Sequence, residues 1–110
     1  MVTNTKAQRN VVFRAIADPT RREILRRLLR DGQQTVGQIA SNFSTSRTAI
    51  SKHLRLLRSA GLVVTRESGA TRLCVLNAKP LAAVDDWLKD YGAFWGDSLR
   101  SLKRHIEDRG

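Results

Sequence analysis

Cysteine is nearly absent from this sequence of 110 residues, which contains only one. A single thiol excludes a disulfide within one chain and any metal cluster built from several cysteines of one chain. Aromatic side chains are also scarce, at 5% of the residues. That content is low for a protein that binds single-stranded nucleic acid by stacking the bases on its rings.

Long hydrophobic runs are missing as well. No apolar stretch approaches the roughly 20 residues of a transmembrane helix, and the first ten residues are too polar for a secretory signal. We therefore expect a cytoplasmic protein with no membrane association. Its length predicts one domain, and 41% hydrophobic with 27% charged residues is typical of a globular chain.

Acidic residues are outnumbered two to one, since 20 Lys and Arg against 10 Asp and Glu give a net charge of +10. A protein this basic usually binds a polyanion, most often nucleic acid. Residues 1–43 hold eight basic and three acidic residues, and residues 44–76 hold six and one, a net +5 each. Residues 77–110 hold six of each kind and both tryptophans. We expect the basic part to bind and the neutral part to pack.

Capping residues predict where the first helices begin and end. After a helix over residues 7–17, Asp18-Pro19 begins a second one, because Asp accepts bonds from free backbone N–H groups and Pro suits the first turn. Asp31-Gly32 ends that helix. Thr35 is followed three residues later by Gln38, which is the spacing of a capping box and indicates a short third helix.

A fourth helix is predicted from about Arg47 to Ala60, after a polar turn. Its apolar residues Ile50, Leu54 and Leu57 share one face. The polar residues of its first turns therefore point away from that face, and these are Ser46, Arg47, Thr48, Ser51 and Lys52. Two β-branched or apolar runs follow, over residues 62–65 and 73–76, and predict a β-hairpin around the loop from Glu67 to Ala70.

The end of the sequence predicts one long helix that begins at Pro80. Its apolar stripe extends over about 27 residues, or roughly 40 Å at 1.5 Å per residue. So small a body cannot cover this length alone, so part of the stripe is expected to face another subunit. The stripe consists of Leu81, Val84, Leu88, Tyr91, Trp95, Leu99, Leu102 and Ile106.

This order of elements predicts a mainly α protein with a small β-hairpin, the winged helix-turn-helix, which binds double-stranded DNA. In such a fold Arg binds guanine O6 and N7 bidentately, and Ser or Thr bonds either base. Other cationic side chains contact phosphate, especially near a helix N-terminus. We predict contacts to the DNA backbone from Arg21, Arg22, His53, Arg55 and Arg58. The alternative for His53 is helix packing, and the alternative for Arg21 and Arg22 is a solvated surface. The predicted wing contacts are Arg66, Ser68, Gly69 and Arg72.

The segments ADPTRREILRRL and TVGQIASNFSTSRTAISKHLRLLRSAGLV, followed by the hairpin, resemble the ArsR/SmtB family of bacterial winged-helix repressors. The likeness covers roughly residues 10–105, and its most specific part extends from Ser44 to Leu62. The DPTRR start and the segment WLKDYGAFW are most similar to the SdpR-like branch, which does not sense metals. The resemblance implies a homodimer that represses transcription from an inverted repeat in a promoter, often its own. It also implies base reading by Arg47, Thr48, Ser51 and Lys52.

The resemblance further implies that helices one and five, the first and the last, join the two subunits. The whole chain is then a single domain, with residues 18–78 as DNA-binding core and wing and residues 7–17 and 79–107 as dimerisation helices. The expected interface consists of Val12, Ile16, Leu81, Val84, Leu88, Tyr91, Trp95, Leu99 and Leu102.

The metal ligands of metal-sensing relatives are missing from the sequence. The short third helix has no Cys-x-Cys pair, and His105 has only Asp97 and Asp108 near it, whereas zinc needs about four ligands. We therefore predict no metal and no cofactor. Cys74, in a predicted strand, is expected to be a buried apolar residue, with a lone redox sensor as the alternative.

Other function classes receive less support from the sequence. It has no glycine-rich phosphate loop and no nucleophile elbow, so an enzyme is not expected. A winged-helix adaptor that binds an acidic partner protein is the alternative to DNA binding, because folds are reused for different functions. A small-molecule inducer bound beside Trp87 or Trp95 is a further alternative, and its identity is not given by the sequence.

Overall fold

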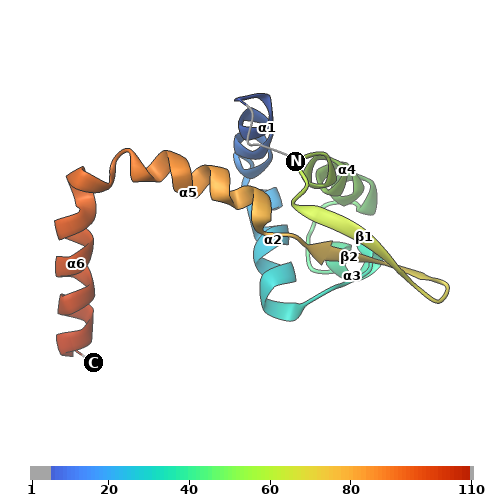
Figure 1. The fold of residues 1–110 in the computed structure, drawn as a ribbon. Coiled ribbons are helices and arrows are strands. Elements are labelled where there is room, and N and C mark those ends of the chain that lie inside the picture. The colour runs from blue at the N-terminus through green and yellow to red at the C-terminus, as the bar shows by residue number, and fades with distance from the viewer. Residues whose placement is uncertain (1–5, 110) are drawn as a thin grey trace.

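The computed structural model describes residues 6–109, without the side chains of residues 95, 97–100 and 108–109. It has the predicted architecture, a winged helix-turn-helix that is mainly helical with one two-stranded hairpin (Figure 1). None of the helices in the described part of the chain is long and apolar enough to cross a membrane. The elements in order are α1 (Lys6–Ile16), α2 (Pro19–Asp31), α3 (Val36–Ala40), α4 (Arg47–Ser59), β1 (Val63–Ser68), β2 (Thr71–Leu76), the 3-10 turn η1 (Lys79–Leu81), α5 (Ala82–Lys89) and α6 (Gly92–Arg109).

The helix caps predicted at Asp18 and Thr35 are present, and Ser46 forms a third one. Asp18 Oδ2 accepts from the Arg21 backbone N–H at 3.0 Å, and Ser46 Oγ accepts from the Ala49 N–H at 3.1 Å. Thr35 and Gln38 form the full capping box, with bonds of 3.1 and 2.8 Å. Such caps satisfy backbone donors that a helix leaves unpaired at its N-terminus. The start of each of these helices is therefore fixed by its local sequence.

The hairpin is longer than the sequence predicted. β1 and β2 are antiparallel and paired from Val63 opposite Leu76 to Ser68 opposite Thr71. The predicted four-residue loop is therefore wrong, because its first two residues belong to β1. Gly69 has a φ of 62°, and glycine in this region allows a tight two-residue turn between strands. The wing consequently extends farther from the body (Figure 1).

One core holds the first four helices to the base of the hairpin. It contains Ile24, Ile50, Leu54, Leu57 and Leu62, all fully buried. Cys74 is part of this core, as predicted. Burial raises the pKa of its thiol, which favours the unreactive protonated form.

The single long helix predicted from Pro80 is wrong. The chain forms η1 and α5, turns at Asp90 and Tyr91, and then forms α6. The turn is closed by bonds from the Asp90 N–H to Trp87 O and from the Tyr91 N–H to Leu88 O, of the tighter i to i+3 kind. Gly92 follows directly, and glycine is among the poorest helix formers.

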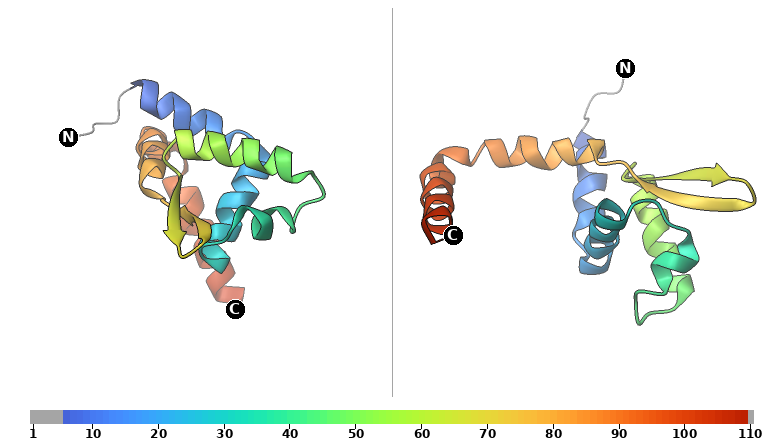
Figure 2. Two further views of the ribbon diagram at one scale, coloured as in Figure 1. Left: turned by 90° about the vertical axis from the view of Figure 1, so that its right-hand side faces the viewer. Right: turned by 90° about the horizontal axis from the view of Figure 1, so that it is seen from below.

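Helix α6 stands away from the body of the chain, at a steep angle to α5 (Figures 1 and 2). It does not pack along any other described element. Its apolar residues Phe94, Leu102 and Ile106 are all exposed, Phe94 at 85%. These three side chains of α6 thus have no cover from the part of the chain that the structure describes.

Candidate nucleic-acid interface

The helix-turn-helix consists of α3, the turn of residues 41–46, and α4. Ile50, Leu54 and Leu57 turn one face of α4 into the core, so its opposite face points outward. The candidate base-reading residues lie as predicted at the start of α4. Ser46, Arg47, Thr48 and Lys52 are exposed and Ser51 is half-buried.

Two of these residues have contacts inside the chain. The Ser46 hydroxyl oxygen caps α4, which uses one of its two lone pairs and leaves the other and the O–H donor for a contact to a base. The guanidinium of Arg47 lies beside Gly37 on α3, where an added Cβ would be 3.8 Å from Nη1. The guanidinium of Arg47, at the exposed start of α4, therefore lies close to the surface of α3.

The two wing arginines lie on opposite faces of the hairpin. Arg72 is paired with Glu67, whereas Arg66 is paired with Leu73 one position away, and alternate strand positions face opposite ways. Arg72 lines a hollow of about 210 Å³ together with Arg58 of α4 and the buried Cys74. Arg66 donates instead to Gln33 Oε1 at 3.4 Å. A duplex lying along one face of the wing would meet only one of them.

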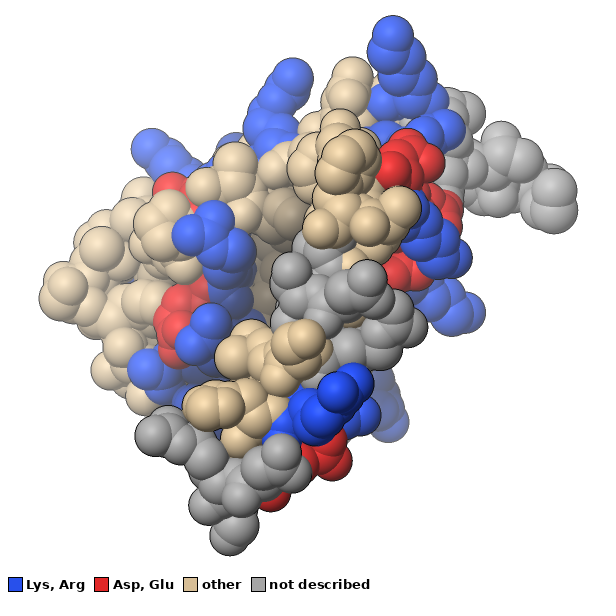
Figure 3. All heavy atoms as spheres, turned by 90° about the vertical axis from the view of Figure 1, so that its left-hand side faces the viewer, with Lys and Arg blue, Asp and Glu red and all other residues tan. Residues whose placement is uncertain are grey.

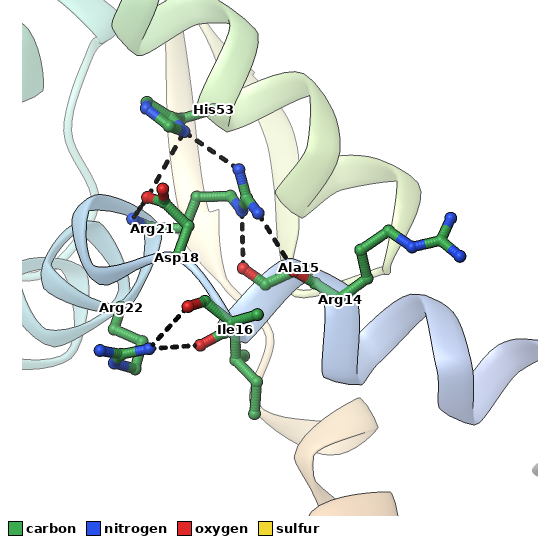
Figure 4. A network of polar contacts seen from close by, with 8 residues as sticks. Arg14, Ala15, Ile16, Asp18, Arg21, Arg22 and His53 are labelled. Atoms are coloured by element: carbon green, nitrogen blue, oxygen red, sulfur yellow. Dashed lines mark hydrogen bonds and ion pairs between the residues drawn. The ribbon is translucent and has the colours of Figure 1, made fainter.

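Arg21 and Arg22, predicted to contact phosphate, both donate to the C-terminal carbonyls of α1 (Figure 4). Arg21 donates from Nε to Ala15 O at 2.6 Å and from Nη2 to Arg14 O at 3.1 Å. Arg22 Nη1 donates to the carbonyls of residues 16 and 17, at 2.8 and 3.1 Å. Carbonyls at the C-terminus of a helix carry partial negative charge, so the two cations stabilise the α1–α2 junction.

His53 of α4 lies against the start of α2. Its Nδ1 is 3.2 Å from Arg21 Nη1 and 3.8 Å from Asp18 Oδ2. The backbone N–H of Arg21, together with the nearby His53 and the Arg21 charge, holds the pKa of Asp18 below its ordinary value of 3.8. This junction was missed from the sequence, because Arg21 and His53 are 32 residues apart.

The predicted dimer residues differ in how far their own chain buries them. Val12 is 4% exposed, and Ile16 and Leu81 pack against the core of the same chain. Val84 and Leu88 are half-buried, whereas Tyr91 and Leu102 are exposed. The side chains of Trp95 and Leu99 lie outside the described residues.

A row of aromatic contacts joins α1 to α5. Phe13 meets Trp87 edge to face at 5.7 Å between ring centroids, and Trp87 meets Tyr91 at 5.2 Å. Phe13 and Trp87 line a groove of about 640 Å³ with polar residues of α1. On the side of the molecule that carries α5 and α6, the basic and acidic side chains of the described residues are mixed and form no continuous basic surface (Figure 3). That distribution suits packing better than binding a polyanion.

Residues 16–66 match the family model of a helix-turn-helix domain. The chain is 37% identical over 98 residues to the HTH-type transcriptional regulator Rv2034 of Mycobacterium tuberculosis. The aligned region covers 89% of this chain and 88% of that protein. A solved ArsR family transcriptional regulator, RHA00566, has a TM-score of 0.73 and 35% identity, with 86% of this chain and 97% of that chain covered. The chain belongs to the ArsR family. As an ArsR family member it is a DNA-binding transcriptional regulator and not an enzyme.

Other relatives within the ArsR family differ in what they do. The transcriptional repressor SdpR of Bacillus subtilis is 39% identical over 82 residues, which are 74% of this chain and 90% of SdpR. The transcriptional activator HlyU of Vibrio cholerae is 36% identical over 78 residues, 71% of each protein. CmtR of M. tuberculosis is a cadmium metal-sensor with a solved structure. It is 48% identical to this chain over 56 residues, which are 51% of this chain and 47% of CmtR. In the described part of this chain, no three His, Cys, Asp or Glu side chains lie together as metal ligands.

The lowered pKa of Asp18 predicts a specific acid dependence of stability. A carboxyl whose pKa is lower in the folded state stabilises the fold above its unfolded pKa, near 4, and loses this effect as the pH falls through the folded value. Asp18→Asn keeps an oxygen for the cap but removes the charge. We expect it to lower the free energy of unfolding at pH 7 and to approach the parent chain near pH 3, in urea titrations.

Two further variants complete this test. Asp18→Ala also removes the cap and should cost about 1 kcal/mol more at pH 7. Asp85→Asn, which removes an exposed carboxylate of α5 that lies 3.4 Å from Lys89 Nζ, is the comparison and shows what a surface ion pair alone contributes. A constant difference between Asp18→Asn and the parent chain from pH 7 to pH 3 would contradict the assignment.

Proposed function

We propose that the protein is a homodimeric repressor that binds an inverted repeat in its own promoter, with one α4 in the major groove of each half-site. The observation that carries this proposal is the division of α4 into two faces. Its apolar face is fully buried, while Arg47, Thr48 and Lys52 of its first two turns are exposed. The net +10 charge, confined to residues 1–76, supplies the attraction to phosphate.

The residues in this proposal have separate tasks. Arg47, Thr48, Ser51 and Lys52 read base edges, and Ser46 combines a base contact with the cap of α4. The exposed Arg55 and Arg58 contact phosphates. Arg22 contributes a further phosphate contact through Nη2, because only its Nη1 donates to the carbonyls of residues 16 and 17. At the wing, Arg72 lies beside Arg58 and contacts the backbone of the same DNA strand. Arg66 lies on the opposite face of the hairpin and, with Ser68 and Gly69 at the tip, contacts DNA from that side.

A second copy of the chain is the proposed cover for α6. The exposed Phe94, Leu102 and Ile106 have no partner surface within one described chain, and the Phe13–Trp87–Tyr91 row offers an apolar surface on α1 and α5. The proposed interface is therefore carried by these exposed residues more than by Val12, which the chain buries itself. Two-fold symmetry then places the half-sites one helical turn of DNA apart, about 10 base pairs, or a multiple of it.

Repression without metal sensing, as in the SdpR-like branch, is the proposed mode of action. The similarity to SdpR extends over 90% of that repressor, whereas the similarity to CmtR is confined to less than half of CmtR. The α3 helix contains no cysteine. Such a repressor would act in the cytoplasm by occupying promoter DNA.

Base reading is tested by Arg47→Ala. Loss of one bidentate contact should cost about 1–3 kcal/mol of binding at one base pair and relax the preference there. Arg66→Ala is the comparison, because loss of a backbone contact should weaken binding to all sequences alike. The measurement is the affinity of each variant for a set of duplexes with single base-pair changes. An unchanged preference in Arg47→Ala would contradict the assignment.

The dimer is tested by sedimentation equilibrium at micromolar concentration. We expect a mass of about 25 kDa, twice the 12.4 kDa of one chain. Leu102→Asp places a charge on the uncovered face of α6 and should shift the equilibrium toward monomer. Leu29→Asp, at an exposed apolar position of α2, is the matched control and should remain dimeric. A parent chain that sediments as a monomer would contradict the proposal.

A further inference from the structure

The guanidinium of Arg21 joins three helices (Figure 4). It belongs to α2, donates to two carbonyls at the end of α1, and lies 3.2 Å from His53 Nδ1 on α4. Each of its three nitrogens thus has a partner inside the chain. A side chain held in this way is oriented toward the protein and not toward a bound duplex.

We propose that Arg21 and His53 are positioning residues that fix the reading helix α4 against the α1–α2 junction, and that this link requires a neutral His53. The inference rests on the proposed function, since it concerns how α4 is held for DNA. It replaces the expectation that these two side chains contact phosphate. DNA affinity then depends on the protonation of one imidazole that touches no DNA.

The chemistry of the contact sets the protonation state. Arg remains charged and has only donors, so His53 Nδ1 accepts its hydrogen bond and the ring proton lies on Nε2. A second proton, taken from solvent onto Nδ1, removes the lone pair and places two cations 3.2 Å apart. Asp18 Oδ2, at 3.8 Å, becomes the remaining partner. At acidic pH the protonated His53 ring therefore loses its hydrogen bond with Arg21 and pairs with the Asp18 carboxylate instead.

The surrounding charges do not change this exchange. Asp18 and Arg21 are the charged groups in contact with His53, and both come from the start of α2. The side chain of Arg14 on α1 points away from the ring (Figure 4). Helix α3 contains no charged residue, and on β1 Arg66 is bonded to Gln33 while Glu67 lies opposite Arg72.

The first test compares pH profiles of binding to duplex DNA from the gene's own upstream promoter. Imidazole titrates between about pH 5 and 8. Between pH 8 and 5.5 we expect the parent chain to lose about three- to tenfold in affinity relative to His53→Gln, whose amide oxygen accepts from Arg21 but does not titrate. His105→Gln, which removes the histidine on α6, is the control and should keep the parent profile.

Two results of that comparison would overturn the proposal. Identical profiles for the parent chain and His53→Gln would show that His53 has no such role. An affinity that rises in acid, and no longer rises in His53→Gln, would show an imidazolium bound directly to phosphate.

The second test separates positioning from phosphate contact by the dependence of affinity on salt. Each phosphate contact that is lost lowers the slope of log affinity against log salt by about one. Arg21→Gln should weaken binding and leave the slope unchanged, whereas Arg55→Gln, at an exposed position of α4, should lower it. A lowered slope in Arg21→Gln would overturn the proposal.

A third measurement needs neither DNA nor a variant. Nitrogen-15 NMR of the imidazole in the free parent chain at pH 8 should show Nδ1 without a proton. A proton on Nδ1 would overturn the link. If no duplex is bound specifically, the proposed function fails, and a proton on Nδ1 in this spectrum would still refute the Arg21–His53 link on its own.

Discussion

Helix α4 is held by Ile50, Leu54 and Leu57, three side chains that are fully buried against the neighbouring elements α1, α2, α3 and β1. Burial of each contributes about 1.5–3 kcal/mol. This packing determines which face of α4 points outward, and hence which polar residues a duplex would meet. A rotation of α4 about its axis would expose leucine and bury arginine. The packing that stabilises the core therefore also keeps the polar face of α4 exposed.

Polar contacts fix the position of α4 in those directions in which apolar packing still allows it to move. Apolar side chains fix the rotation of α4, but they tolerate small tilts and shifts. The caps at Asp18, Thr35 and Ser46 set where each helix begins, and the Arg21–His53 contact sets how α4 meets the end of α1. Helix α1 also carries Phe13, which contacts Trp87 of α5. Arg21 therefore links α4 to the helix that bears part of the surface proposed for dimerisation.

Local signals in the sequence predicted most of the fold and the exposed face of α4. Capping residues and the apolar spacing of residues 50, 54 and 57 act within a few positions, so they are readable without coordinates. The break between α5 and α6 was missed because the apolar spacing continues through it, while the turn depends on Asp90, Tyr91 and Gly92. The Arg21–His53 contact joins residues far apart in the sequence, and their charge alone suggested DNA. The hairpin was predicted too short because the outer strand residues 66–68 and 71–72 are polar, whereas the prediction followed apolar runs.

The central claim is that this chain recognises one promoter sequence through α4. The most direct measurement is fluorescence anisotropy of the protein on duplex DNA from its own upstream promoter against a scrambled duplex, at two salt concentrations. The account predicts that the promoter is bound about 10³-fold or more tightly than the scrambled duplex, with both affinities falling as salt is raised. Equal affinity for the two duplexes, or no binding to either, would contradict it.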